Sequence, residues 1–140
     1  MKKQIFTIEE DGFNGAWYMN PAGSKCGVIL MLGDSSEDRM AVCGAKWLQE
    51  NGCHVMAMSP DKQDYGHHNY PLERFGRAIS FMKAHGCEKL GVIGASTTGM
   101  LALVAASYYP ELSLTIALSP PDFVMEGFYQ DGKDGMHERP

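Results

Sequence analysis

The sequence predicts a doubly wound α/β domain with a mainly parallel sheet, on two observations. Short apolar runs alternate with longer helical stretches along the 140-residue chain, an order typical of parallel strands joined by right-handed crossovers. The run Cys26–Leu32 is apolar throughout, as expected for a strand buried on both faces. We therefore expect residues 1–140 to form a single three-layer αβα domain.

The start of the chain predicts a β-hairpin. Two short strand-like runs, residues 2–8 and 13–19, flank the polar stretch Glu9-Glu10-Asp11-Gly12, and a polar turn between two such runs is typical of a hairpin. We expect the hairpin to add an antiparallel edge to the parallel sheet.

After the hairpin, strands and helices alternate to the end of the recognisable pattern. Gly33-Asp34-Ser35-Ser36 interrupts the first apolar run and offers side chains that can cap a helix. Asn51-Gly52 and Gly86 are each expected to close a helix in the left-handed conformation. The predicted strands are Cys26–Leu32, His54–Met58, Leu90–Ile93 and Leu112–Ser119, and the predicted helices cover residues 37–51, 71–85 and 98–109.

The stretch Gly94-Ala95-Ser96-Thr97-Thr98-Gly99 lies between a predicted strand and a predicted helix. A serine on such a tight turn matches a nucleophile elbow, which exposes the hydroxyl above the strand ends. The positive end of the following helix would favour an oxyanion at the same place. The alternative is that Ser96 is an ordinary helix N-cap, a position that serine also favours.

Composition and charge exclude several classes of protein. The formal net charge is −5, and no basic stripe suited to a nucleic-acid backbone is present. No apolar run reaches the length of a membrane span, and the N-terminus does not resemble a signal peptide, so we expect a cytoplasmic protein that does not bind membranes.

The four cysteines form no C-x-x-C pair, which argues against a zinc or thioredoxin-like site, and no cofactor is expected. Cys26, Cys53 and Cys87 each lie at or just before the start of a predicted strand, which places them at the amino edge of the sheet. Simple packing of these thiols is favoured over a three-thiolate metal site.

Two stretches resemble a known family. One is the elbow run Gly-Ala-Ser-Thr-Thr-Gly-Met-Leu-Ala-Leu, and the other is residues 116–128, which contain the pattern Ser-Pro-x-x-x-Val-x-x-Gly. Both look like the α/β-hydrolase domain of the acyl-CoA thioesterases and bile-acid-CoA:amino-acid N-acyltransferases, and the likeness extends from Cys26 onward. It implies a hydrolase that acts on a small acyl ester or thioester.

The resemblance implies a role for each of four residues. Ser96 matches the nucleophile, and serine rather than the cysteine of the acyltransferases favours hydrolysis over transfer. The backbone N–H of Thr97 would be one oxyanion donor and that of Asp34 the second. Gly33 would allow the close approach of the chain there.

The same resemblance implies that the catalytic acid and histidine follow two further strands, so the 140 residues correspond to about the first two-thirds of such an enzyme and are expected to be inactive alone. Asp122, His137, His67 and His68 are the internal candidates for partners of Ser96, but each is better explained as a solvated loop residue. Residues 127–140 are polar and glycine-rich, as expected for the start of a lid or loop.

The predicted strand Leu112–Ser119 would form a bare apolar edge. A homodimer, a missing C-terminal segment or a separate partner chain would have to cover it. The alternative function is therefore a non-catalytic α/β module that binds a small acyl ligand or dimerises through this edge.

Overall fold

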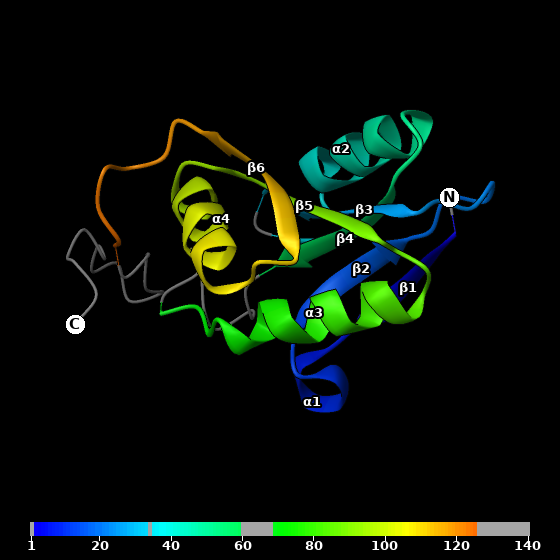
Figure 1. Cartoon of the computed structure of the whole chain (residues 1–140), viewed down its shortest axis with the longest axis horizontal. Helices are drawn as coiled ribbons and strands as arrows, with labels where there is room; N and C mark the ends of the chain where they lie inside the picture. Colours follow the sequence, from blue (N-terminus) through cyan, green and yellow to red (C-terminus); the bar gives the residue numbers. More distant parts are fainter. Residues whose placement is uncertain (1, 34, 60–68, 126–140) are drawn as a thin grey trace.

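The computed structural model describes residues 2–33, 35–59 and 69–125, which form a six-stranded sheet flanked by helices (Figure 1). This arrangement confirms the predicted α/β fold class. In chain order the elements are β1 (Lys3–Phe6), α1 (Ile8–Asp11), β2 (Asn14–Tyr18), β3 (Cys26–Met31), α2 (Arg39–Glu50), β4 (His54–Ser59), α3 (Glu73–Ala84), β5 (Lys89–Ala95), α4 (Thr97–Tyr108) and β6 (Leu112–Leu118).

The strands lie in the order β1-β2-β4-β3-β5-β6. Strands β4, β3, β5 and β6 are parallel, whereas β1 and β2 form an antiparallel hairpin whose second strand pairs with β4. The expected hairpin edge is therefore confirmed. Its connection is a single helical turn, α1, because the Thr7 side chain caps the turn at Glu10 N and Gly12 closes it with a φ of 80°.

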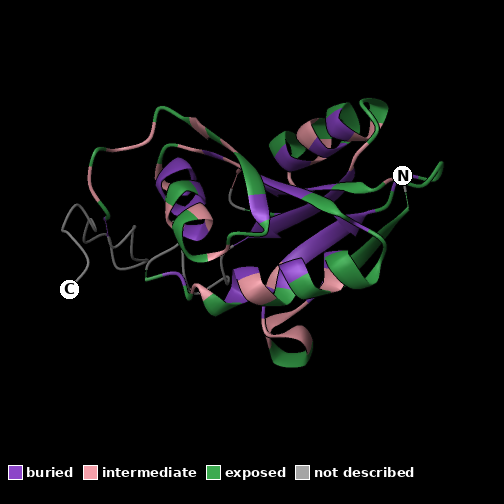
Figure 2. Ribbon diagram, in the orientation of Figure 1, coloured by how far each residue is buried: buried purple, intermediate pink, exposed green. Residues whose placement is uncertain are grey.

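Helix α2 covers one face of the sheet, while α3 and α4 cover the other (Figure 1). The α2 face packs a small cluster that includes Ala41, Ala45 and Leu48 from the helix. The opposite face holds the larger core, rich in aromatic residues and methionine. Figure 2 shows that β4 is buried along its length, as expected for a strand covered on both faces.

The structure corrects the predicted start of helix α2. It begins at Arg39 and its cap is Asp38, whose Oδ1 accepts a hydrogen bond of 2.8 Å from Ala41 N. Ser35 and Ser36 precede this cap and do not form it. The expected helix ends are confirmed, since Gly52 and Gly86 adopt φ values of 86° and 90°.

Strand β6 forms the outer edge of the sheet in the described part of the chain. Leu114, Ile116 and Leu118 are 59%, 39% and 52% exposed. They lie on the α2 face of the sheet, because Ile116 pairs in register with Ile93, which packs against the α2 cluster. The described residues therefore leave both the edge and one face of β6 uncovered.

Among the helices of these described segments, none combines the length and the apolar character needed to cross a membrane.

Candidate active site

The predicted elbow (residues 94–99) is a sharp turn between β5 and α4. Strand β5 ends at Ala95 and α4 begins at Thr97, so Ser96 alone connects them. Ser96 has a φ of 54° and a ψ of −119°, and such a backbone is costly for a residue with a side chain. Its side chain is exposed. A strained, exposed serine between a strand and a helix is the geometry that a nucleophile elbow requires.

The alternative explanation, that Ser96 is an ordinary N-cap, is wrong. Ser96 occupies the N-cap position of α4, but its side chain makes no capping hydrogen bond and its backbone is not extended. An N-cap serine has β-region dihedral angles and accepts a bond from the helix. Asp38 of α2 meets both conditions. The Ser96 hydroxyl is therefore not used to stabilise its own helix.

The start of α4 supplies the polar backbone groups next to Ser96. The first bond of the helix runs from Met100 N to Ser96 O, at 3.1 Å. The N–H groups that precede Met100 have no acceptor within the helix, and they carry the positive end of its dipole. The Thr97 N–H belongs to this set, so an oxyanion at the Ser96 hydroxyl would meet favourable electrostatics.

The elbow is tied to the strands on either side of β5. Ser96 N donates to Leu118 O at the end of β6, at 2.8 Å. On the other side the buried hydroxyl of Thr98 donates to Met31 O at the end of β3, at 2.6 Å. The same hydroxyl accepts from Ala95 N at 2.9 Å. These bonds hold the strained turn between two strand ends.

The elbow departs from the usual G-x-S-x-G pattern only at its fifth position. Gly94 is the first glycine, and a Cβ there would collide with the carbonyl oxygen of Thr98. Thr98 stands where the second glycine is usual, and its side chain is buried. Because its hydroxyl is hydrogen-bonded, the branched side chain fits where the strand and helix cross.

The loop after β3 begins with Gly33, whose φ of 76° lies in the left-handed region. A Cβ at Gly33 would also collide with the Asp38 carboxylate, so both conformation and space require glycine there. Asp34, the predicted second oxyanion donor, lies outside the described residues, and the direction of its N–H remains a prediction.

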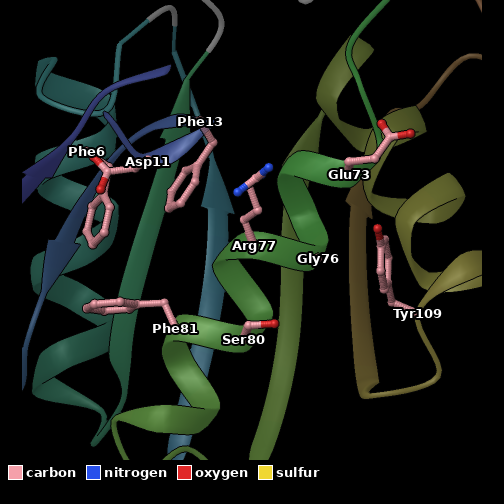
Figure 3. Close-up of a pocket in the computed structure, with 9 residues that line it drawn as sticks. All are labelled: Phe6, Asp11, Phe13, Glu73, Gly76, Arg77, Ser80, Phe81 and Tyr109. Carbon is pink, nitrogen blue, oxygen red and sulfur yellow. The ribbon is translucent and has the colours of Figure 1, made fainter. Parts of the chain in front are cut away.

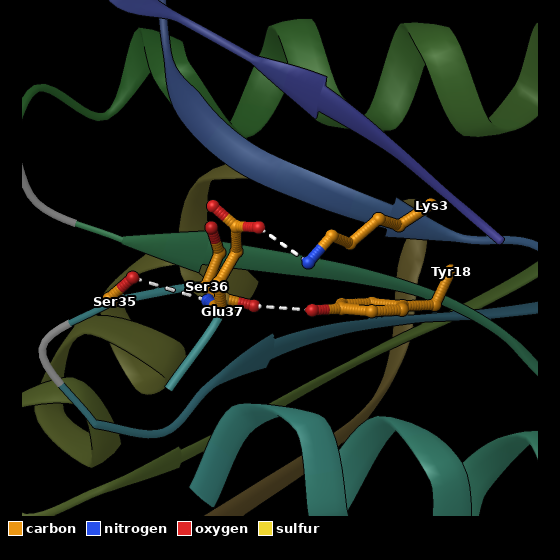
Figure 4. Close-up of polar contacts among 5 residues, drawn as sticks. All are labelled: Lys3, Tyr18, Ser35, Ser36 and Glu37. Carbon is orange, nitrogen blue, oxygen red and sulfur yellow. Dashed lines mark hydrogen bonds and ion pairs between the residues drawn. The ribbon is translucent and has the colours of Figure 1, made fainter. Parts of the chain in front are cut away.

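The continuation of this loop is anchored by the N-terminal hairpin (Figure 4). The Tyr18 hydroxyl of β2 donates to Ser36 O at 2.8 Å. The Lys3 ammonium of β1 pairs with Glu37 at 2.5 Å, and Glu37 N donates to Ser35 Oγ at 3.2 Å. Sequence reasoning missed this anchor, since nothing local to Tyr18 or Lys3 indicates a contact with residues 35–37.

The Tyr18 hydroxyl and the Lys3 ammonium, which hold this loop, both stay protonated at neutral pH. Burial raises the pKa of the Tyr18 hydroxyl, which therefore remains a donor. The hydrogen bond with Glu37 raises the pKa of Lys3, so the ammonium stays charged.

The described residues do not place a histidine at the elbow. His54 begins β4 at the opposite end of the sheet, where its Nδ1 accepts from Asn20 N at 2.8 Å. His85 follows the last turn of α3, and its Nδ1 lies 2.8 Å from Phe81 O. His67, His68 and His137 lie outside the described residues. Asp122 is exposed beside α4, where it lines a hollow of 240 Å³ with Met100 and Phe123 among others.

The described segments contain no group of three His, Cys, Asp or Glu side chains that could hold a metal ion. A separate cavity of 660 Å³ lies along α3 (Figure 3), where Arg77 projects from the helix toward Phe13. None of the residues that line it belongs to the elbow. It is therefore not part of the candidate site.

The fold is that of known hydrolases. Est1E from Butyrivibrio proteoclasticus superposes with a TM-score of 0.62 at 19% identity, covering 86% of this chain and 51% of that one. A Pyrococcus furiosus esterase superposes with a TM-score of 0.64 at 20% identity, covering 86% of this chain and 49% of that one. For a dienelactone hydrolase from Anabaena variabilis the TM-score is 0.59 at 18% identity, and the match covers 81% of this chain and 60% of that one.

These similarities show the α/β-hydrolase fold, and the chain spans about half the length of the first two proteins. No family model matches the sequence, and no curated protein matches it either. The narrower likeness to the acyl-CoA thioesterase family therefore stays a prediction.

Proposed function

We propose that the chain carries the nucleophile of a serine hydrolase, which transfers the acyl group of an ester or thioester to water through Ser96. The observation that supports this most strongly is the conformation of Ser96. Its exposed hydroxyl sits on a positive-φ turn and does not cap the helix that it precedes. Strain of this kind persists where the surrounding structure enforces it, and it concentrates at functional sites.

The chemistry follows from the groups around the elbow. Ser96 Oγ attacks the carbonyl carbon of the substrate while a general base takes the hydroxyl proton. The alcohol or thiol then leaves with a proton, and water hydrolyses the acyl-enzyme. The N–H groups of Thr97 and Asp34 are proposed to hold the oxyanion, and one such donor typically contributes about 10²–10³ in rate.

The general base and its acid partner are proposed to follow the described sheet, on loops after two further strands. The structurally similar hydrolases support this arrangement, because the part that superposes on this chain is only about half of each of them. A thioester of coenzyme A is the narrower substrate proposal. It rests on the elbow run and on residues 116–128, of which 126–128 lie outside the described part.

A fluorophosphonate reagent tests the nucleophile directly. The protein is treated with and without added imidazole, which supplies an external base, and the adduct is located by peptide mass spectrometry. We expect phosphonylation at Ser96, accelerated by imidazole, and no adduct there in Ser96→Ala. The exposed Ser107 serves as an internal control, because its hydroxyl is bonded to Val104 O at 2.7 Å within an ordinary helix.

Equal modification of Ser96 and Ser107 would show that the elbow confers no special reactivity. Absence of any adduct at Ser96, even at high imidazole concentration, would overturn the proposal.

The edge strand β6, which the described residues leave uncovered, favours a second candidate function, a dimerisation module. The strand Leu-Ser-Leu-Thr-Ile-Ala-Leu has no charge, and its alternation of large and small residues is symmetric around Thr115. In an antiparallel pair centred on Thr115, Leu114 of each copy would face Ile116 of the other. Uncharged strand edges of this kind pair readily.

Sedimentation distinguishes this candidate. A dimer is expected for the unmodified chain, and Thr115→Lys should dissociate it by placing two ammonium groups opposite each other. Gln4→Lys, on the opposite edge strand β1, is the matched control and should remain dimeric. A monomeric unmodified chain would rule out this second function.

A further inference from the structure

The starts of β3 and β4 bring two cysteines side by side. Gly27 pairs in parallel register with His54, so the preceding residues, Cys26 and Cys53, are neighbours one step back along each strand. Adjacent strands lie about 4.8 Å apart, which is inside the range of roughly 4.4–6.8 Å that the Cα atoms of disulfides span.

Both side chains belong to the same face of the sheet. Cys53 packs against the α2 cluster, together with Val55 of the same strand. Cys26 alternates with Val28, which also belongs to that cluster. Because side chains at every second position share a face, the two thiols lie on the α2 face.

A serine clamps the two backbones together at this point. Ser24 Oγ accepts from Cys26 N at 2.9 Å and donates to Gly52 O at 2.6 Å. Cys53 is held in turn by the end of α2, because its N–H donates to Leu48 O at 3.0 Å. The cysteines therefore sit next to each other in a fixed part of the fold.

The other two cysteines do not share this position in the strand register. Cys87 is buried on the opposite face, in the core beneath α3, and burial raises the pKa of its thiol to about 11. Cys43 is exposed on α2 and belongs to neither strand. Within the pair, Cys26 is exposed and Cys53 is half-buried, so an oxidant in solvent reaches Cys26 before Cys53.

We propose that Cys26 and Cys53 are an oxidisable dithiol, which closes to an intramolecular disulfide on reaction with a small disulfide such as glutathione disulfide. The Cys26 thiolate attacks one glutathione sulfur and releases the first glutathione thiolate. Cys53 then loses its proton to solvent and attacks the Cys26 sulfur, releasing the second glutathione. Two protein thiols are oxidised and one glutathione disulfide is reduced. The site is independent of the proposed hydrolase function.

The bond would join the start of β3 to the turn between α2 and β4, at the sheet edge opposite the elbow. It would close the chain segment between the two cysteines, and such closure stabilises a fold chiefly by restricting the unfolded chain. We expect the melting temperature to rise by several degrees on oxidation.

Peptide mass spectrometry of the native protein after treatment with glutathione disulfide tests the proposal. We expect a Cys26–Cys53 crosslink with a mass two hydrogens lower than that of the free thiols. Cys43, the control thiol, should carry only a glutathione adduct. In Cys53→Ser, Cys26 should keep its glutathione, and the increase in melting temperature should disappear.

The same treatment in urea separates native geometry from chance pairing. We expect the unfolded chain to form mixed pairs among all four cysteines. A stable glutathione adduct on Cys26 of the native unsubstituted protein, or a native crosslink that involves Cys87 or Cys43 instead, would overturn the proposal.

Discussion

The two ends of the parallel strands differ in how their polar groups are used. At the amino ends, side chains complete the hydrogen bonding of the backbone: Ser24 bridges two segments and His54 accepts from Asn20 N. At the carboxyl ends, Ser96 and Ser119 have positive φ values of 54° and 46°, and the Ser96 hydroxyl does not cap its helix.

The difference shows where the fold gains stability and where it stores strain. Backbone strain of about 1–3 kcal/mol per residue persists only where neighbouring contacts enforce it. The contacts of Thr98 with Met31 and of Ser96 with Leu118 supply that enforcement. Substitutions at the carboxyl ends should therefore change the elbow, whereas changes at the amino ends should alter stability alone.

Gly94→Ala should have the largest effect. The new Cβ would collide with the Thr98 carbonyl and lie 2.8 Å from Gly99 N, both backbone groups. We expect unfolding to become easier by about 3 kcal/mol or more, as in severe overpacking. Urea denaturation of the variant and the unsubstituted protein measures this loss in the free energy of unfolding.

Gly91→Ala in the same strand is the matched control for this substitution. A Cβ at Gly91 would lie 3.2 Å from Leu114 O, so a smaller loss in the free energy of unfolding is expected than for Gly94→Ala. Equal losses for the two variants would mean that the crossing of β5 and α4 is not especially tight.

Thr98→Val should come next, because valine keeps the shape of threonine and removes its hydroxyl. Met31 O and Ala95 N would each lose a buried partner, at a cost of about 2 kcal/mol. Hydrogen exchange at Ala95 should accelerate as well. Thr98→Ser retains the hydroxyl and should keep the exchange slow; fast exchange in both variants would contradict the assigned bond.

Two substitutions of Ser96 measure the strain itself. Ser96→Ala keeps a Cβ on the positive-φ backbone, whereas Ser96→Gly removes it. The glycine variant should be the more stable of the two by about 1 kcal/mol. Thermal unfolding of both variants makes the comparison, and equal stability would show that the turn is unstrained.

The smallest expected effect is a pH dependence of stability that arises from His54, at the amino ends of the parallel strands. Burial and, second, His85 lower its pKa from the ordinary 6.5. As the pH falls below that value, the unfolded chain takes up a proton that the folded protein excludes, so stability should decrease. Above the ordinary pKa of 6.5, the contribution of neutral His54 to stability is fully present.

Urea denaturation between pH 7 and pH 5 measures the pH dependence of stability. His54→Gln should flatten the dependence, whereas His85→Gln should largely retain it. An unchanged slope in His54→Gln would assign the effect to other groups.

Several elements could be predicted from local sequence signals alone. The apolar run from Cys26 and the glycines at 52 and 86 correctly indicated a buried strand and two helix ends. The cap of α2 was predicted too early, because Ser35, Ser36 and Asp38 are all good caps and only the folded loop selects Asp38. The polar stretch at residues 9–12 lies in a helical turn rather than a tight hairpin turn. The Thr7 side chain caps this turn by accepting a hydrogen bond from Glu10 N.

The position of the elbow is encoded locally, because a strand, a small-residue turn and a helix each depend on neighbouring residues. The way Ser96 is held, and the way the loop after β3 is held, depend instead on contacts between distant segments. The Thr98–Met31 bond joins residues 67 positions apart, and the Tyr18–Ser36 bond joins residues 18 apart. Both depend on the strand order β1-β2-β4-β3-β5-β6, and no local pattern specifies which strands become neighbours.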